Sequence, residues 1–391
     1  MIQSGLTELW YFDRPHLAAS IVEHVSHGRA GRVALFGARR TGKTTLLRRE
    51  AMPEAESHGF VAVYADCWHD RANPISGLNY ALEQAIARIE VPASKVGRRL
   101  ATEVRRVSVV GLALEFGPEP DQAAPDSAYL RFDWLIARLL ARARKPVFFV
   151  IDEAQAIADA AEADRIAAAI RTAFTKYEAQ VRVVLTGSSE LKLAKLLART
   201  QAPLYNFMPR VQYEPLGDAF VAHVCACFER ATNGRRLDAT RAVALLDRLG
   251  RQPAAFLAAV EAPLADPTRT LDDGVEQLLA PQMPSPMTAA WEDCTLLQRA
   301  TLVATAAGVR LTSDEGLRMI GGMVGTGRAT NSSVARAIGA LEERHLVDRD
   351  VFTSHHARYV VADPIFALWL ERNAARLMPV VSKAHVEKAG R

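Results

Sequence analysis

One short segment carries residue types that could hold phosphate. The stretch "VALFGARRTGKTTLL" (33–47) joins an apolar run to a loop with two glycines, a lysine and two threonines. The loop matches GxxxxGK[ST] without a mismatch and lies between an expected strand and an expected helix. Its glycines let backbone N–H groups close around phosphate oxygens, and the helix N-terminus adds partial positive charge. We therefore expect it to bind the phosphates of a nucleotide.

Two side chains of this loop have distinct expected roles. Lys43 is placed to reach the β- and γ-phosphates, and Thr44 to offer its hydroxyl to Mg²⁺. The predicted phosphate-binding residues are Gly37, Ala38, Arg39, Arg40, Thr41, Gly42, Lys43, Thr44 and Thr45.

A second segment, "VFFVIDEAQ" (147–155), ends an apolar run in two acids. This places Asp152 at the carboxyl end of a central strand, where open α/β sheets bind ligands. We expect Asp152 to hold Mg²⁺, mostly through water, and Glu153 to polarise the attacking water in hydrolysis. The alternative is a pair of surface acids.

A third segment, "VVLTGSS" (183–189), ends the next apolar run in polar residues. Ser188 is the candidate that senses the γ-phosphate or holds the water, with Thr186 or Ser189 as alternatives; a plain turn is also consistent. Arg199 and Arg210 follow at spacings where an arginine stabilising transition-state charge can occur. For either arginine, a solvated surface position is the favoured alternative.

Composition sets wide limits on the protein class. The 391 residues indicate two or three domains, and 49% hydrophobic residues suffice for ordinary cores. A net charge of +4 is too small to indicate nucleic-acid binding by itself. The four cysteines lack zinc-site spacing and are expected to be buried apolar residues. Without a signal peptide or a membrane-length apolar run, we expect a soluble cytoplasmic protein.

Residues 1–216 alternate strand-like and helix-like segments. The first four expected strands are continuous apolar runs, which is typical of strands buried on both faces of a parallel sheet. This predicts a P-loop α/β core. The alternating segment 105–121 is expected to form an inserted β-hairpin, either a surface excursion or a partner contact. The expected strands are 32–36, 60–67, 146–153, 181–189 and 210–216.

The rest of the chain is expected to form two helical units. Residues 217–288 are predicted to be a helical lid, ending in a proline-rich linker at 280–288. Residues 289–391 are predicted to be a winged-helix domain, with helices near 291–307, 312–320 and 331–344, a two-stranded wing and a closing helix. Either Asn331 or Ser332 is expected to cap the recognition helix.

The winged helix offers basic and polar side chains for DNA. Acids close by (Glu342, Glu343, Asp348 and Asp350) would repel DNA. Double-stranded DNA contact and a protein-docking role therefore both stay open. The candidate DNA-contacting residues are Ser332, Ser333, Arg336 and Arg344 near the helix, and His355, His356 and Arg358 on the wing.

These segments together resemble the archaeal-type ATPase family of the STAND branch, close to AAA+ proteins and archaeal origin-recognition ATPases. The resemblance rests on "GARRTGKTTLL", "VIDEAQ", "LTGSSELKLAKLL", "APLYNFMPRVQYEPL" and "ARYVVADPIFALWLER". It implies ATP and Mg²⁺ as ligands, and a P-loop ATPase core followed by a lid and a winged helix.

The resemblance also implies roles for residues outside the three motifs. In "FDRPHL", Arg14 keeps the arginine expected to contact the adenine side, although Asp13 and Pro15 replace a glycine and a glutamate. In the lid motif, Pro253 matches, while Arg251 stands where the family has a second glycine. In "PLYNF", Phe207 occupies the place of an arginine, which leaves Arg210 as a weak substitute.

The function expected from these features is an ATP-hydrolysing switch whose nucleotide state repositions the winged helix. An AAA+ DNA loader or remodeller, and an ATP-responsive DNA-binding regulator with little turnover, are the alternatives. An ATP-dependent homo-oligomer and a protein partner are also consistent with the resemblance.

Overall fold

The computed structural model describes residues 9–28, 31–90, 123–198, 202–280, 286–350 and 358–378. The chain divides into two compact units, Met1–Pro215 and Leu216–Arg391. The predicted hairpin at 105–121 lies outside the described residues. The further division of the second unit into lid and winged helix, with the boundaries given above, stays a prediction.

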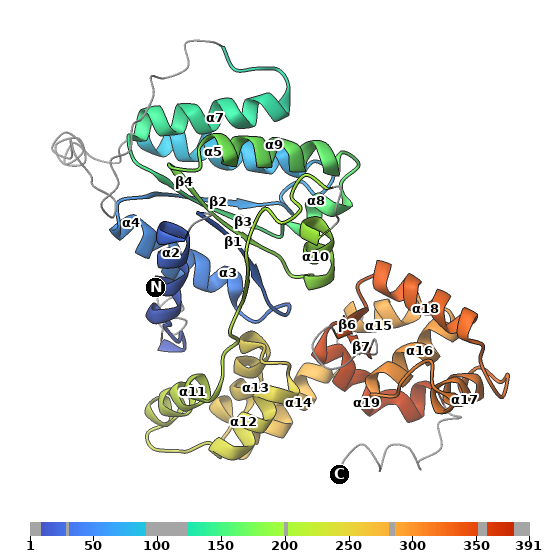
Figure 1. Cartoon of the computed structure of the whole chain (residues 1–391). Coiled ribbons are helices and arrows are strands. Elements are labelled where there is room, and N and C mark those ends of the chain that lie inside the picture. Colours follow the sequence, from blue (N-terminus) through green and yellow to red (C-terminus); the bar gives the residue numbers. More distant parts are fainter. Residues whose placement is uncertain are drawn as a thin grey trace. The chain divides into compact units, whose positions relative to one another are not determined.

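The first unit is built on a five-stranded parallel sheet with the strand order β2-β3-β4-β1-β5 (Figure 1). All four long strands of the prediction are present, and the P-loop α/β fold is confirmed. The strands are β1 (Arg32–Phe36), β2 (Val61–Asp66), β3 (Val147–Asp152), β4 (Val181–Thr186) and the short β5 (Arg210–Gln212).

Helices cover both faces of this sheet (Figure 1). Strand residues alternate between two cores: Phe149 and Val183 belong to one, Phe148 and Val184 to the other. Both faces are apolar, which explains the continuous hydrophobic runs in the sequence. One layer contains α5 (Pro74–Glu90), α7 (Ala128–Ala143), α8 (Gln155–Asp159), α9 (Ala163–Lys176) and α10 (Glu190–Ala198). The other contains α2 (Pro15–His27), α3 (Lys43–Leu46), the π-helical turn η1 (Leu47–Ala51) and α4 (Met52–Ser57).

The second unit begins with four helices. They are α11 (Asp218–Ala231), α12 (Ala239–Arg248), α13 (Pro253–Ala265) and α14 (Leu271–Leu279). Helices α13 and α14 approach closely at Gly274, where a Cβ atom would lie 1.9 Å from the Ala259 carbonyl oxygen. A glycine in the middle of α14 is intrinsically unfavourable, so its value here is the close helix contact that it permits.

The remaining helices and strands follow the order of a winged helix. They are α15 (Pro286–Glu292), α16 (Leu296–Ala306), α17 (Asp314–Met323), α18 (Asn331–Glu343), β6 (Val347–Asp350), β7 (Arg358–Val361) and α19 (Pro364–Leu377). Strands β6 and β7 pair antiparallel.

The structure corrects three details of this region. The helix expected near 291–307 is two helices, because Thr295 and Gln298 form a capping box that begins α16. The N-cap of α18 is Thr330 rather than Asn331 or Ser332, because Thr330 and Ser333 satisfy each other's backbone N–H groups. Pro286, placed in the expected linker, begins α15.

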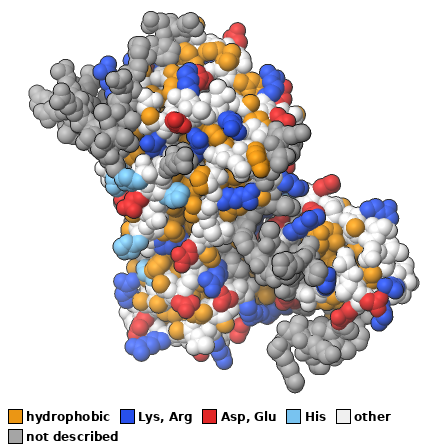
Figure 2. Space-filling model, viewed as in Figure 1, with side chains coloured by type: hydrophobic (Ala, Val, Ile, Leu, Met, Phe, Trp, Pro, Cys, Tyr) orange, Lys and Arg blue, Asp and Glu red, His pale blue; other side chains and the backbone are white. Residues whose placement is uncertain are grey.

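The distribution of charged side chains and the state of the cysteines are those of an ordinary folded protein. In the face shown in Figure 2, basic and acidic side chains are interspersed. All four cysteines are free, and Cys67, Cys227 and Cys294 are buried. Among the described helices, none combines the length and apolar character that crossing a membrane requires.

Gly274→Ala is expected to destabilise the second unit by roughly 1–3 kcal/mol, because the added methyl group overpacks the α13–α14 contact. Gly339→Ala is the matched control, since a Cβ atom at this helical position meets nothing within 4 Å. The control should be neutral or stabilising by up to about 1 kcal/mol. Chemical denaturation of the two variants and the parent measures both changes; equal midpoints for the variants would contradict the packing argument.

Candidate functional site

The phosphate loop connects β1 to α3 at the carboxyl edge of the sheet. Arg40 and Gly42 both have positive φ angles, 61° and 98°, and Gly42 precedes the first residue of α3. Gly37 packs against Tyr213, whose Cβ atom would lie 2.9 Å from an added Cβ. The loop thus closes tightly at Gly37 and turns sharply at Gly42, as a phosphate cradle requires.

Lys43 lies inside the loop and is only 6% exposed. Its Nζ atom donates to the carbonyl oxygens of Gly37 and Ala38, both at 2.6 Å. The ammonium group is therefore held over the loop, where a phosphate oxygen would replace a carbonyl as its acceptor. This position agrees with the role predicted for Lys43, which stays a prediction.

Tyr213 supports the loop from the far side. It follows β5, is 1% exposed, and donates from its hydroxyl to the Thr41 carbonyl at 3.0 Å. Its ring centroid lies 6.0 Å from Lys43 Nζ and 5.1 Å from the Arg14 guanidinium carbon. Burial raises the pKa of Tyr213, so the hydroxyl remains a donor at neutral pH. Arg14, which is predicted to contact the adenine side of the nucleotide, thus lies beside the Tyr213 ring.

The Thr44 hydroxyl and the Asp152 carboxylate meet directly. Thr44 Oγ1 donates to Asp152 Oδ2 at 2.6 Å, and Asp152 is 3% exposed. Tyr64 from β2 donates to the same Oδ2 at 2.9 Å, while the Glu153 backbone N–H donates to Oδ1 at 2.9 Å. Burial, followed by the Asp152 charge, raises the pKa of Tyr64 far above its usual range. The two oxygen donors predicted to hold Mg²⁺ are thus adjacent, and hard oxygen ligands suit that ion.

Glu153 and Ser188 form a second polar contact at the same edge. Ser188 Oγ donates to Glu153 Oε2 at 2.7 Å. Glu153 has a φ of 52°, an unusual backbone angle for a residue with a side chain. Such strain often accompanies functional sites.

The contacts also separate Ser188 from its two alternatives. Thr186 is completely buried within β4, and its hydroxyl has no hydrogen-bond partner among the described residues. Ser189 Oγ instead accepts the Lys192 backbone N–H at 3.4 Å, at the start of α10.

Gln155 is a member of this site that the sequence reasoning missed. It is 4% exposed, and its Nε2 donates to Ser188 Oγ at 3.0 Å and contacts Glu153 Oε2. Gly187 leaves room for it, since a Cβ atom there would lie 2.2 Å from Gln155 Oε1. The only signal in the sequence is a polar residue in "DEAQ" before an apolar segment. Tyr64 and Tyr213 were missed for the same reason: each is a single polar residue in a strand-like run.

The contacts described above do not include the other predicted residues. Arg210 is exposed on the edge strand β5, with its guanidinium carbon 5.3 Å from the Phe36 ring. Pro253 begins α13 in the second unit. Arg199, His355 and His356 lie outside the described residues.

Phe207 is buried and packed between two arginines. Its ring centroid lies 3.9 Å from the guanidinium carbon of Arg32 and 5.4 Å from that of Arg171. In addition, Arg32 Nε donates to the Phe207 carbonyl at 2.8 Å. The position where the resembling family has an arginine is therefore a packing position in this chain.

Comparisons with known proteins agree with this architecture. Residues 16–185 match the model of the AAA ATPase domain. A Walker-type ATPase of Pyrococcus abyssi has a similar structure, with a TM-score of 0.60, 17% identity, and 92% of this chain and 96% of that one covered. The Aeropyrum pernix ORC2 protein, in ADPNP–ADP complexes, has a TM-score of 0.51, 15% identity, and 96% and 93% covered. At these identities the similarity establishes the fold. No curated protein sequence matches the chain.

Ser188→Ala is expected to lower the nucleotide hydrolysis rate about ten- to a hundredfold with little change in nucleotide affinity. It removes a hydrogen bond to a charged carboxylate, an interaction that contributes about 1.5–3 kcal/mol. Ser189→Ala is the control and should hydrolyse like the parent, because Ser189 does not contact Glu153. Steady-state phosphate release together with nucleotide titration tests this; equal effects of the two substitutions would refute the assignment of Ser188.

Proposed function

We propose that this chain, whose residues 16–185 match the model of the AAA ATPase domain, is an ATP-hydrolysing molecular switch. In this proposal, ATP binds at the loop of residues 37–45, and nucleotide state controls the contacts that the winged helix makes with DNA or protein. The contact of Glu153 with Ser188, beside the Thr44–Asp152 pair, carries the proposal.

The geometry supports hydrolysis as well as binding. Lys43 and the loop N–H groups would hold the phosphates, and the Thr44 and Asp152 oxygens would hold Mg²⁺, which neutralises phosphate charge when bound. Glu153 would accept a proton from the attacking water. Ser188 donates to Oε2 of this carboxylate, and the hydrogen bond would orient Glu153 so that its other oxygen can take the proton.

Contacts within the second unit support coupling of the lid to the winged helix. Gly250, in the Gly-Arg-Gln-Pro motif of the lid, packs so closely on Pro364 of α19 that a Cβ atom would lie 2.3 Å from its Cγ. An ion pair between Arg372 of α19 and Glu276 of α14 adds a second connection. A lid movement on ATP binding would therefore carry α19 with it. Pro253, which begins α13 directly after Gln252, is the lid residue that the resemblance assigns to nucleotide binding.

The exposed face of α18 supports a contact with double-stranded DNA. Ser332, Ala335 and Arg336 are exposed on it, and Gly339 has no neighbour that a Cβ atom would meet. Small side chains beside an arginine allow close approach of a phosphate backbone. Two residues of the earlier candidate set have other partners: Ser333 forms the capping box of α18 with Thr330, and Arg344 donates to the Asp293 carbonyl at 3.1 Å. Glu342, expected to repel DNA, is paired with Arg349 at 3.1 Å.

Glu153→Gln is expected to abolish most ATP turnover, by about a hundredfold or more, while ATP binding persists. The amide keeps the shape of the carboxylate but cannot take the proton of the attacking water. Single-turnover hydrolysis and equilibrium binding of ATP measure the two properties separately. Lys43→Ala is the contrasting variant and should weaken ATP binding itself. Parent-like hydrolysis by Glu153→Gln would overturn the role of Glu153.

Arg336→Ala is expected to weaken binding to a mixed-sequence DNA duplex several-fold and to reduce the salt dependence by about one phosphate contact. Arg376→Ala, which removes an exposed arginine from α19, is the matched control. Fluorescence anisotropy across a salt series gives both quantities, with and without ATP. If the full chain binds no duplex, or both variants bind alike, DNA contact by α18 is wrong and protein docking becomes the favoured role.

A further inference from the structure

The second unit contains a cavity that the proposed function does not use. It has a volume of about 600 Å³ and lies among the end of α11, the α11–α12 loop, one face of α12 and the α13–α14 loop. This volume falls within the range of sites that bind small molecules, roughly 300–1,000 Å³. The cavity belongs wholly to the four-helix part of this unit.

Arginines are concentrated around this cavity. Residues 217–280 contain seven arginines and nine carboxylates, yet five of the arginines line the one cavity with only two of the carboxylates, Asp238 and Asp272. The five are Arg235, Arg236, Arg241, Arg248 and Arg269. Guanidinium groups recognise phosphate by paired, charge-assisted hydrogen bonds.

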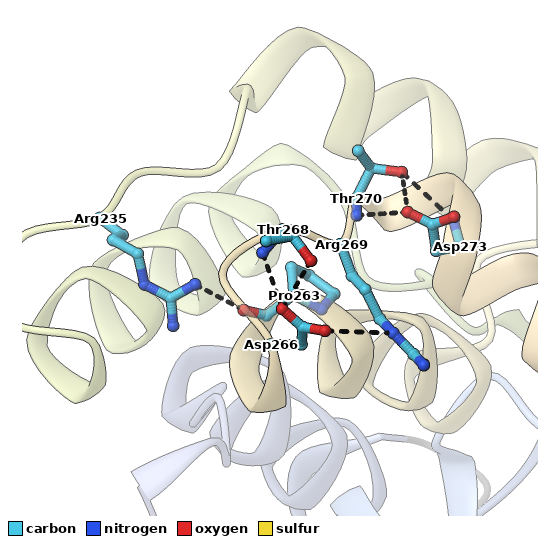
Figure 3. A network of polar contacts seen from close by, with 7 residues as sticks. All are labelled: Arg235, Pro263, Asp266, Thr268, Arg269, Thr270 and Asp273. Carbon is cyan, nitrogen blue, oxygen red and sulfur yellow. Dashed lines mark hydrogen bonds and ion pairs between the residues drawn. The ribbon is translucent and has the colours of Figure 1, made fainter.

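One of these arginines is held in place by the fold. Arg235 donates from NH1 to the Pro263 carbonyl at 2.8 Å (Figure 3). It also donates from NH2 to the Leu264 carbonyl at 3.3 Å. Its guanidinium carbon lies 5.3 Å from the Phe228 ring. The carbonyls at the end of α13 therefore fix a positive charge at the cavity wall.

Most of the nearby carboxylates already accept hydrogen bonds from backbone N–H groups. Asp266 accepts from the Thr268 N–H and hydroxyl, and Asp273 accepts from the Thr270 N–H and hydroxyl (Figure 3). These hydrogen bonds hold the pKa of each carboxyl below its usual value. Asp238 likewise caps α12 by accepting the Arg241 N–H at 3.1 Å.

The ion pairs at the cavity are exposed and open to exchange. Arg236 pairs with Glu229 at 2.8 Å, Arg241 with Asp238 at 3.7 Å, and Arg269 with Asp266 at 3.6 Å. The three arginine side chains are 80%, 76% and 46% exposed. Exposed pairs of this kind contribute little, about 0–1 kcal/mol, so a phosphate can replace the carboxylate as partner. Arg248 forms no hydrogen bond or ion pair with the described residues. Its charge acts on Glu371, where it lowers the pKa and partly offsets the effect of burial.

The floor of the cavity is apolar. Phe228, Leu245 and Pro263 are buried and line it, and Leu237 and Leu271 add further apolar surface. An inorganic anion would leave this surface in contact with water, whereas an organic body on the phosphate would cover it. The apolar floor and the arginines at the wall together fit a phosphorylated ring compound of nucleotide size.

We propose that this cavity is a second ligand site, separate from the loop of residues 37–45, which binds a nucleotide-sized organic phosphate. The ring of the ligand lies against Phe228 and Leu245, and its phosphates meet Arg241, Arg248 and Arg269. The site does not depend on the ATPase assignment, because the cavity is complete without any residue of the first unit.

Calorimetric titration of the full chain with ADP tests the proposal. The parent should bind two ADP molecules per chain, Lys43→Ala one, the triple variant Arg241→Ala/Arg248→Ala/Arg269→Ala one, and the combination none. Arg230→Ala, which changes an exposed arginine of α11 outside the cavity, is the control and should keep both sites. Circular dichroism checks that the triple variant still folds. We expect it to fold, because all three arginine side chains are exposed.

Further probes identify the chemistry that is recognised. Pyrophosphate and adenosine should each bind the Lys43→Ala chain at least about tenfold more weakly than ADP, because each lacks half of the recognised features. A single ADP per parent chain, lost in Lys43→Ala and unaffected by the triple variant, would overturn the proposal. A single-stranded oligonucleotide that binds Lys43→Ala through the three arginines while ADP does not would overturn it in favour of a nucleic-acid contact.

Discussion

The position of strand β4 between β1 and β3 governs the candidate site. The phosphate loop ends β1 and the acidic pair ends β3, so the tip of β4 is the only strand end between them. Parallel strands end at the same edge of the sheet, so the order of the strands by itself brings Ser188, after β4, close to Glu153, after β3. The same arrangement leaves Asp152 free to meet Thr44 across the loop.

Buried polar residues hold this edge in shape. Tyr64 fixes one oxygen of Asp152, Tyr213 supports the phosphate loop, and Gln155 joins Ser188 to Glu153. Each side chain is partly or fully buried and forms at least one hydrogen bond there, as most buried polar groups do. The loss of one partner would leave another unsatisfied at a site that needs fixed geometry. The supporting residues therefore matter to the chemistry even though none is expected to touch the reacting atoms.

The second unit combines close packing with separated polar surfaces. Gly274 and Gly250 permit contacts of helix with helix and of the lid motif with α19, which a larger residue would prevent. Under the proposed function, such contacts would transmit a movement of one part of the unit to another. Its basic features lie elsewhere: Arg336 is on α18 beside small side chains, and five other arginines surround the cavity of α11 to α14. The unit thus presents two different basic surfaces.

The sequence by itself determined the parallel α/β core, the phosphate loop, the acidic pair and the order of helices and wing. These features depend on local patterns: apolar runs, glycine spacing, and an acid at a strand end. Only the tertiary structure placed Ser188, rather than Thr186 or Ser189, in contact with Glu153, because the direction of the chain after β4 decides which of these side chains reaches the carboxylate. It also brought in Tyr64, Gln155 and Tyr213, moved the α18 cap to Thr330, and gathered five arginines around one cavity. Those outcomes depend on contacts between segments distant in the chain or on side-chain direction, neither of which a local pattern records.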